Sequence, residues 1–315
     1  MKKILVTGGC GYMGSILIPK LLSKGYYVVC LDTQWFGCYL QESSNLEIIK
    51  SDMRNIDTLN LKNIDSIIHL ANVANDPAVE INPTMSWEIN VLASQQLIDK
   101  AARENVKHFI FASSGSVYGI KSEERVTEDL TLVPISTYNK TKMVAERVLM
   151  SYSEKLQVHC IRPATVCGLS PRMRLDVAVN LLTFQALEKN EITVLGGSQI
   201  RPNIHIDDIT DLYLHLLSRR SSIPSGFYNA GFENISILDI AEMIRIRTNC
   251  TIKIEESNDP RSYRQDSSKI LKTGFNPKKK VGDAIEEIID AYNNNKLKDK
   301  AQSHTVSWMK KNNIK

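Results

Sequence analysis

Residues 136–142 read STYNKTK and place Tyr138 and Lys142 four positions apart. On a helix, side chains at positions i and i+4 lie on one face and can interact. A phenol beside an ammonium group could act as a general base, because a nearby positive charge favours the phenolate and lowers the tyrosine pKa. An exposed pair on a surface helix has the same spacing, so this motif alone leaves both interpretations open.

A second candidate is the stretch TGGCGYMG at residues 7–14, with Gly8, Gly11 and Gly14 in a Gly-x-x-Gly-x-x-Gly pattern. Glycines permit unusual backbone angles and let a pyrophosphate approach main-chain N–H groups. The following strand ends at Asp32, about 20 residues beyond the glycines, where a carboxylate can hold the adenosine ribose hydroxyls. Together these features indicate a dinucleotide site.

The acidic residues bear on the identity of that dinucleotide. A 2'-phosphate placed 4 Å from Asp32 would be repelled by about 4 kcal/mol per unit charge at an effective dielectric constant of 20. NAD is therefore favoured over NADP. Asp52, which closes a strand at residues 46–52, could meet the adenine amino group or be a simple turn residue.

The elements that must position these residues alternate between strands and helices. Short apolar, β-branched runs occur at residues 3–7, 27–32, 46–52, 65–71, 108–114 and 158–166, with helical patterns at about 14–24, 86–104 and 138–155. This alternation predicts an α/β fold with a Rossmann-type, doubly wound parallel sheet covered on both faces. After about residue 167 the pattern loosens. We expect an NAD-binding domain with the catalytic residues at 1–167 and mainly a smaller substrate-binding lobe at 168–315, some segments of which could return to the first domain.

Composition excludes several classes of function. The 315 residues are 43% apolar and 23% charged, with a formal net charge of +4 and basic residues that form no stripe suited to nucleic acid. There is no apolar stretch long enough to span a membrane. The six cysteines show no C-x-x-C pair and no cluster with histidine, so we expect no metal site and a reducing, cytoplasmic location.

Eight segments taken together resemble an extended short-chain dehydrogenase/reductase of the NAD-dependent epimerase/dehydratase family, which acts on nucleotide sugars. In chain order they are TGGCGYMG, SDM, HLANVAND, WEIN, FASSGSVYG, YNKTK, RPATVCG and RPNIHIDD, spanning residues 7 to about 208. The resemblance implies the following NAD-binding residues: Gly8, Gly11, Tyr12, Met13, Gly14, Asp32, Asp52, Met53, Leu70, Ala71, Asn72, Asn90, Ser113, Tyr138, Lys142 and Pro163.

The same resemblance assigns the catalytic residues. It places Tyr138 and Lys142 on the catalytic helix of the family, with Tyr138 as the base and Lys142 also holding the nicotinamide ribose. The third member is Ser114, four positions before Tyr118, which is expected to hydrogen-bond the substrate oxygen. Strand alternation points Ser114 and Ser116 to one side, and Ser116 is interpreted as structural.

Substrate contacts are expected from the second half of the chain. Arg201 matches the arginine with which the family grips the diphosphate of its substrate, and a guanidinium suits phosphate geometry. Asn180 and Arg261 are weaker candidates for binding the nucleotide. Arg172 and Arg174 could reach phosphate or sugar, or could belong to a solvated basic loop.

The implied function is NAD-dependent epimerisation of a nucleotide-diphosphate sugar, at C4, through a keto-sugar intermediate. Members that remove water from C5 and C6 carry Thr-Asp-Glu where this sequence has Ser114, Gly115 and Ser116, so dehydration is disfavoured. The alternatives are a nucleotide-sugar 4-dehydrogenase or 4-ketoreductase of a deoxysugar or heptose pathway, and a non-catalytic dinucleotide-binding regulator. The resemblance also implies a homodimer formed through the helices at 86–104 and 138–155.

Overall fold

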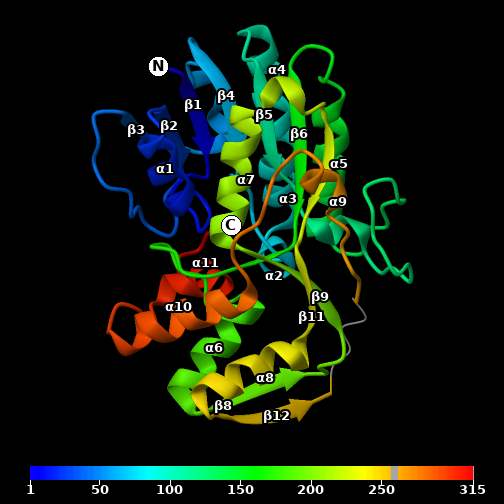
Figure 1. Cartoon of the computed structure of the whole chain (residues 1–315). Helices are drawn as coiled ribbons and strands as arrows, with labels where there is room; N and C mark the ends of the chain where they lie inside the picture. Colours follow the sequence, from blue (N-terminus) through cyan, green and yellow to red (C-terminus); the bar gives the residue numbers. More distant parts are fainter. Residues whose placement is uncertain (257–261, 315) are drawn as a thin grey trace.

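A parallel seven-stranded sheet forms the centre of the protein, in the order β10-β6-β5-β4-β1-β2-β3 (Figure 1). The structure is a computed structural model that describes residues 1–256 and 262–314. The strands are β1 (Lys3–Thr7), β2 (Tyr27–Asp32), β3 (Leu46–Lys50), β4 (Ile64–His69), β5 (His108–Ala112), β6 (Gln157–Pro163) and β10 (Gly226–Ala230). This topology confirms the predicted doubly wound fold. The sequence patterns did not reveal β10, because a glycine and an asparagine interrupt its apolar run.

Helices cover both faces of this sheet. On one face, α1 (Gly14–Ser23) and α7 (Ile206–Ser218) pack against Ile4, Val6 and other strand residues of a fully buried cluster. On the other face, α4 (Ala93–Arg103) and α5 (Thr137–Met150) pack against Leu5 and its neighbours. Alternation along β1 thus sends successive side chains to opposite layers, as the period of a strand requires.

The helix expected at residues 86–104 has three parts. It consists of α3 (Pro83–Trp87), a π-helical turn η2 (Glu88–Leu92) and α4. The π turn contains Asn90, whose side chain donates to the Val73 carbonyl at 3.2 Å and accepts from the Val73 N–H at 2.8 Å. Such turns often occur at functional sites, and here the turn fixes the segment that follows β4.

The remaining elements build a smaller lobe below the sheet (Figure 1). Its strands form a three-stranded sheet, in the order β11-β9-β7, and a parallel pair of β12 and β8. Their bounds are β7 (Thr165–Cys167), β8 (Glu191–Leu195), β9 (Ile200–His205), β11 (Glu233–Ser236) and β12 (Thr251–Glu255), with helices α6 (Ala178–Lys189), α8 (Ile237–Thr248) and α10 (Val281–Asn293).

Short helices complete the chain. They are η1 (Met53–Thr58), α2 (Asp76–Val79), η3 (Gly115–Tyr118), η4 (Arg220–Ser222), α9 (Ser268–Leu271), η5 (Ala301–Ser303) and α11 (Thr305–Lys311). The last of these, α11, returns to contact α2 beside the central sheet. Among the described helices, none combines the length and the apolar character needed to cross a lipid bilayer.

A buried ion pair anchors α5 to the sheet. The Arg162 guanidinium on β6 donates to both Glu146 carboxylate oxygens, at 2.9 and 2.8 Å. The side chains of Arg162 and Glu146 are 1% and 0% exposed. Burial lowers the pKa of Arg162, but the hydrogen bonds and charge of Glu146 more than offset this and raise it above its usual value. The pair therefore fixes the helix that carries Tyr138 and Lys142.

Candidate active site

One cavity of about 520 Å³ opens at the carboxyl ends of the central strands. The strand order reverses between β1 and β4, and in doubly wound sheets ligands bind outside the carboxyl ends of the strands at this point. The cavity is lined by the turn after β1, the ends of β2, β4 and β5, the first turns of α5, and segments of the smaller lobe. Residues far apart in the sequence therefore meet in one continuous site.

The glycine-rich turn forms one wall. Gly8 has a φ of +70°, and a Cβ there would lie 2.6 Å from the Ala71 backbone nitrogen. A Cβ on Gly14 would lie 2.4 Å from the Gly9 carbonyl oxygen, so α1 could not approach the turn so closely. The first turn of α1 has no acidic residue, which leaves the positive end of the helix dipole available to an anion. Gly11, Tyr12 and Met13 also line the cavity.

Asp32 lies at the end of β2 on the same cavity. Its carboxylate accepts from the Cys10 N–H at 3.0 Å and from the Gln34 N–H at 2.6 Å. Burial raises the pKa of Asp32, while these two hydrogen bonds and the charge of Arg172 oppose the increase. The carboxylate is thus positioned by the backbone and faces the space next to the glycine-rich turn.

Two residues expected to contact the cofactor, Asp52 and Asn90, do not line the cavity. Met53 lines the cavity but Asp52 does not, because the Asp52 carboxylate caps η1 and forms an ion pair with Arg54 at 2.9 Å. Asn90 also lies behind the cavity wall, where it holds the backbone of Val73. Leu70, Ala71, Asn72, Ser113 and Pro163 all line the cavity.

The catalytic candidates line the same cavity, at the end of β5 and the start of α5. Tyr138 lies in the first turn of α5. Ser136 caps the start of this helix, where its hydroxyl accepts a hydrogen bond from the Asn139 N–H at 3.1 Å. Lys142 is 2% exposed, and its Nζ donates to the Ala112 carbonyl at the end of β5 at 2.7 Å. Ser114 lies two residues beyond that carbonyl and lines the same cavity.

Burial dominates the electrostatics of this group. It raises the pKa of Tyr138 to about 12, despite the opposing hydrogen bond of Ser114. It also lowers the pKa of Lys142 to about 7. The Lys142 Nζ lies 5.9 Å from the centroid of the Tyr138 ring. Burial therefore dominates the pKa of Tyr138, and the influences that oppose it come from Ser114 and Arg174 rather than, as the sequence leads us to expect, from Lys142.

Buried polar atoms of the cavity wall lack partners. The Ser113 hydroxyl, the side-chain amide oxygen of Asn72 and the Arg172 Nε form no hydrogen bond with the described residues. Unpaired buried polar groups are costly, and they are commonly satisfied by a ligand or water. Together with the glycine-rich turn and Asp32, these atoms fit a polar dinucleotide that extends along the cavity.

The smaller lobe supplies the remaining wall. Arg201 on β9 lines the cavity. Asn180 does not, since its side chain accepts from the Gly168 N–H at 3.0 Å and donates to the Tyr12 hydroxyl at 3.0 Å. Arg261 lies outside the described residues. Cys167 is fully buried in the core of the smaller lobe, away from the cavity lining.

The two arginines of the 170–176 segment are not in a solvated loop. Both line the cavity, and Arg174 forms a bidentate ion pair with Asp176 at 2.8 and 3.2 Å. The charge of Arg174 lowers the pKa of Tyr138, whereas Asp76 on α2 raises it. Asp76, which accepts from the Ser136 hydroxyl, also lines the cavity.

Sequence reasoning missed several lining residues. Trp35 and Phe36 lie three and four positions after Asp32, and two adjacent aromatic residues in a loop next to a nucleotide-site carboxylate were a usable signal. Thr305 and Met309 on α11 gave no signal, because their place in the cavity depends on the return of the chain to α2.

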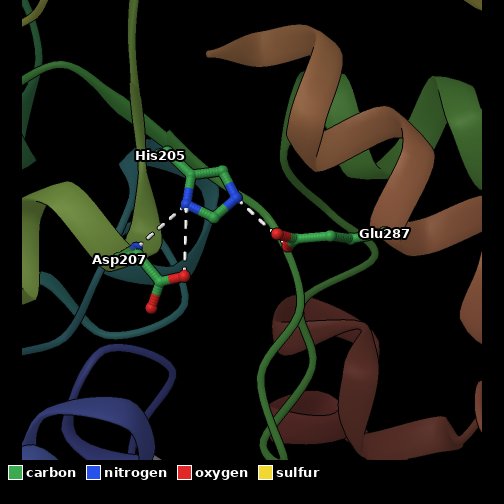
Figure 2. A group of neighbouring side chains, drawn as sticks. All are labelled: His205, Asp207 and Glu287. Atoms are coloured by element: carbon green, nitrogen blue, oxygen red, sulfur yellow. Dashed lines mark hydrogen bonds and ion pairs between the residues drawn. The ribbon is translucent and has the colours of Figure 1, made fainter. Parts of the chain in front are cut away.

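A group of His205, Asp207 and Glu287 has ligand atoms close enough to suggest a metal site (Figure 2). Both imidazole nitrogens are already engaged. Nδ1 accepts from the Asp207 N–H at 3.1 Å, and Nε2 contacts Glu287 Oε2 at 3.1 Å. Lys20 and Lys279 pair with the two carboxylates, each at 2.9 Å. This group caps α7 and joins it to α10, which is a structural role.

A family model described as the NAD dependent epimerase/dehydratase family matches residues 4–231. The UDP-glucose 4-epimerase of Lactobacillus helveticus is 27% identical over 313 residues, covering 90% of this chain and 94% of that protein. The uncharacterized UDP-glucose epimerase YtcB of Bacillus subtilis is 31% identical over 265 residues, covering 77% and 81%.

A solved structure agrees with these relatives. The UDP-glucuronic acid 4-epimerase from Bacillus cereus, in complex with UDP-glucuronic acid and NAD, superposes with a TM-score of 0.82. It is 29% identical, and the match covers 93% of this chain and 99% of that chain. The similarity thus extends over both the central sheet and the smaller lobe.

Proposed function

This chain belongs to the NAD-dependent epimerase/dehydratase family, and we propose that it is an NAD-dependent nucleotide-sugar epimerase that acts at C4. The observation that carries the proposal is the single cavity that joins Asp32 and the glycine-rich turn to Tyr138, Lys142 and Ser114. Similarity to the UDP-glucose and UDP-glucuronic acid 4-epimerases supports the reaction and the substrate class.

The cavity residues divide the chemistry between them. Tyr138 accepts the proton of the sugar 4-hydroxyl and returns it after the sugar has turned its other face. Ser114 hydrogen-bonds the same oxygen. NAD, when bound, supplies the carbon that takes and returns the hydride, and its cationic ring favours the phenolate of Tyr138. Lys142, held by the Ala112 carbonyl, binds the ribose of the cofactor.

The substrate lies between the two parts of the chain in this proposal. Residues 1–167 provide most of the cofactor site. The smaller lobe, drawn from residues 168–315, binds the nucleotide-diphosphate end of the sugar, while α7 and β10 of that stretch return to the central sheet. Arg201 is the candidate for the diphosphate, because a guanidinium matches phosphate oxygens in a bidentate manner. Its position on the cavity wall supports this role.

An epimerase must keep its cofactor between two hydride transfers, so the net reaction consumes none. We expect purified protein to interconvert a UDP-hexose or UDP-uronate with its C4 epimer without added coenzyme, with the product identified by NMR. Absorbance at 340 nm should stay constant during turnover. A 340 nm change in proportion to product would instead indicate the 4-dehydrogenase or 4-ketoreductase. Absence of turnover with NAD bound would indicate a regulator.

The proposed role of Asp32 predicts that this carboxylate sets the preference for NAD over NADP. Asp32→Ala should change the NAD-to-NADP affinity ratio by up to about 10³-fold towards NADP, because a repulsion of about 4 kcal/mol between the carboxylate and the 2'-phosphate is removed. Titration of both cofactors against wild-type and variant protein measures this ratio. Asp57→Ala, which removes an exposed carboxylate outside the cavity, should leave it unchanged. Tighter binding of NADP than NAD by the wild type would contradict the role of Asp32.

A homodimer is also part of the proposal. The stretch from α3 to α4 packs on α5 and exposes Leu92 by 52% and Trp87 by 37%, so an apolar surface lies on the helices expected to pair. Sedimentation equilibrium should give twice the mass of 35.5 kDa. A monomer at micromolar concentration would contradict it, as would a dimer unaffected by Leu92→Glu.

A further inference from the structure

Arg172 is a buried guanidinium without a carboxylate partner among the described residues. It is 4% exposed. Its Nη1 donates to the Met173 carbonyl at 3.4 Å and its Nη2 to the Thr305 hydroxyl at 3.3 Å, while Nε has no partner. Both distances lie beyond the usual range for N–H···O bonds. Since a buried charge without a hydrogen-bonded counter-ion is costly, an anionic ligand in the cavity would stabilise this guanidinium.

Two separate segments contact this guanidinium. It stacks on the ring of Phe36, with Cζ 4.1 Å from the centroid. Thr305, at the start of α11, accepts from its Nη2. The Phe36 loop is itself held by α11, because Trp308 Nε1 donates to the Trp35 carbonyl at 2.6 Å. Arg172 is therefore a rigidly placed cation.

Its location points to the cofactor end of the cavity. Arg172 lines the cavity, and Ser170, two positions before it, donates to the Tyr12 carbonyl of the glycine-rich turn at 2.8 Å. Arg172 is also close enough to Asp32 for its charge to lower the pKa of that carboxyl. Burial and the charge of Arg174 lower the pKa of Arg172 to about 10, so it remains protonated at neutral pH. By contrast, the neighbouring Arg174 is already neutralised by Asp176.

We propose that Arg172 binds the diphosphate of NAD from the second half of the chain, while the glycine-rich turn binds it from the first. The proposal rests on the proposed function, since it requires NAD in this cavity. A guanidinium forms strong, charge-assisted hydrogen bonds with phosphate oxygens. Release of the cofactor then requires the contacts of both Arg172 and the glycine-rich turn to break. This suits an enzyme that retains NAD through two hydride transfers.

The test compares ligands that differ in phosphate content. Arg172→Met preserves an unbranched stem against Phe36 but removes the charge. It should weaken NAD and ADP-ribose by about 10–100-fold, the range for hydrogen bonds to charged groups, and leave adenosine unchanged. Calorimetry or competition provides the affinities, and the NAD content of purified protein should fall in parallel. Arg245→Met, an exposed arginine on α8 with the same loss of charge, is the matched control.

Each other outcome has a defined meaning. Unchanged affinity of Arg172→Met for NAD and ADP-ribose overturns the proposal, as does an equal loss for adenosine, which would indicate a distorted pocket. A loss confined to UDP-glucose on NAD-loaded protein also overturns it and assigns Arg172 to the substrate. Should Arg172→Met fail to fold, Arg172→Lys must weaken ADP-ribose but not adenosine, or the proposal fails. A wild type that binds no NAD would instead refute the proposed function.

Discussion

Tyr138→Phe is expected to lower nucleotide-sugar turnover by about 10²–10⁴-fold, the usual contribution of a general acid–base group. The substitution removes the proton acceptor but keeps the ring, which packs against a buried cluster that includes Val73 and Met309. Cofactor binding should therefore be nearly unchanged. Turnover is measured by NMR of the sugar products, and bound NAD by its release on denaturation.

A matched control is available at the other end of the same helix. Tyr152 follows α5, and its hydroxyl donates to Asp99 at 3.3 Å, outside the cavity lining. Tyr152→Phe makes the same chemical change and should retain wild-type turnover. A loss of less than about tenfold for Tyr138→Phe would exclude Tyr138 as the base, because a general base contributes more than this.

Glu146→Leu is expected to lower the free energy of unfolding by about 3–5 kcal/mol, the cost of leaving a buried charge unpaired. Arg162 would remain buried beneath α5, with the Tyr118 hydroxyl and the Glu128 carbonyl as its other hydrogen-bond partners. Urea denaturation followed by circular dichroism measures the change, provided that unfolding is two-state.

The double variant Glu146→Leu/Arg162→Met tests whether the unpaired charge of Arg162 causes this loss of stability. Replacing both partners with apolar groups removes the unpaired charge, so the double variant should lose much less than the sum of the single variants. The exposed pair of Glu242 and Arg245 is the control, since Glu242→Gln should cost at most about 1 kcal/mol. Additive losses at 146 and 162 would show that the pair is not coupled.

The features that the sequence predicted well depend on short-range regularities. Strand period, glycine spacing and the four-residue interval between Tyr138 and Lys142 are local, because backbone geometry dictates which neighbours share a face. They led to the parallel sheet, which the structure confirms. The glycine spacing also nominated Asp32, and the family resemblance nominated Ser114, Tyr138 and Lys142; the fold brings all four to one cavity.

Contacts that the motifs do not reveal decided the rest. Asp52 and Asn180 have residue types suited to ligand binding, yet Asp52 pairs with Arg54, only two positions away, and Asn180 is held by Gly168 and the distant Tyr12. Conversely, Arg172 could not be distinguished from a solvated arginine until Phe36 and Thr305 were seen around it.

The sequence by itself thus determined the fold family, through eight segments in chain order, and the glycine-rich turn with Asp32, which lie close together in the chain. Only the tertiary structure decided which polar atoms remain free for a ligand. The physical reason is that a buried donor or acceptor must find a partner. For Asn180 that partner lies 168 positions away at Tyr12, and no local pattern encodes such a distance.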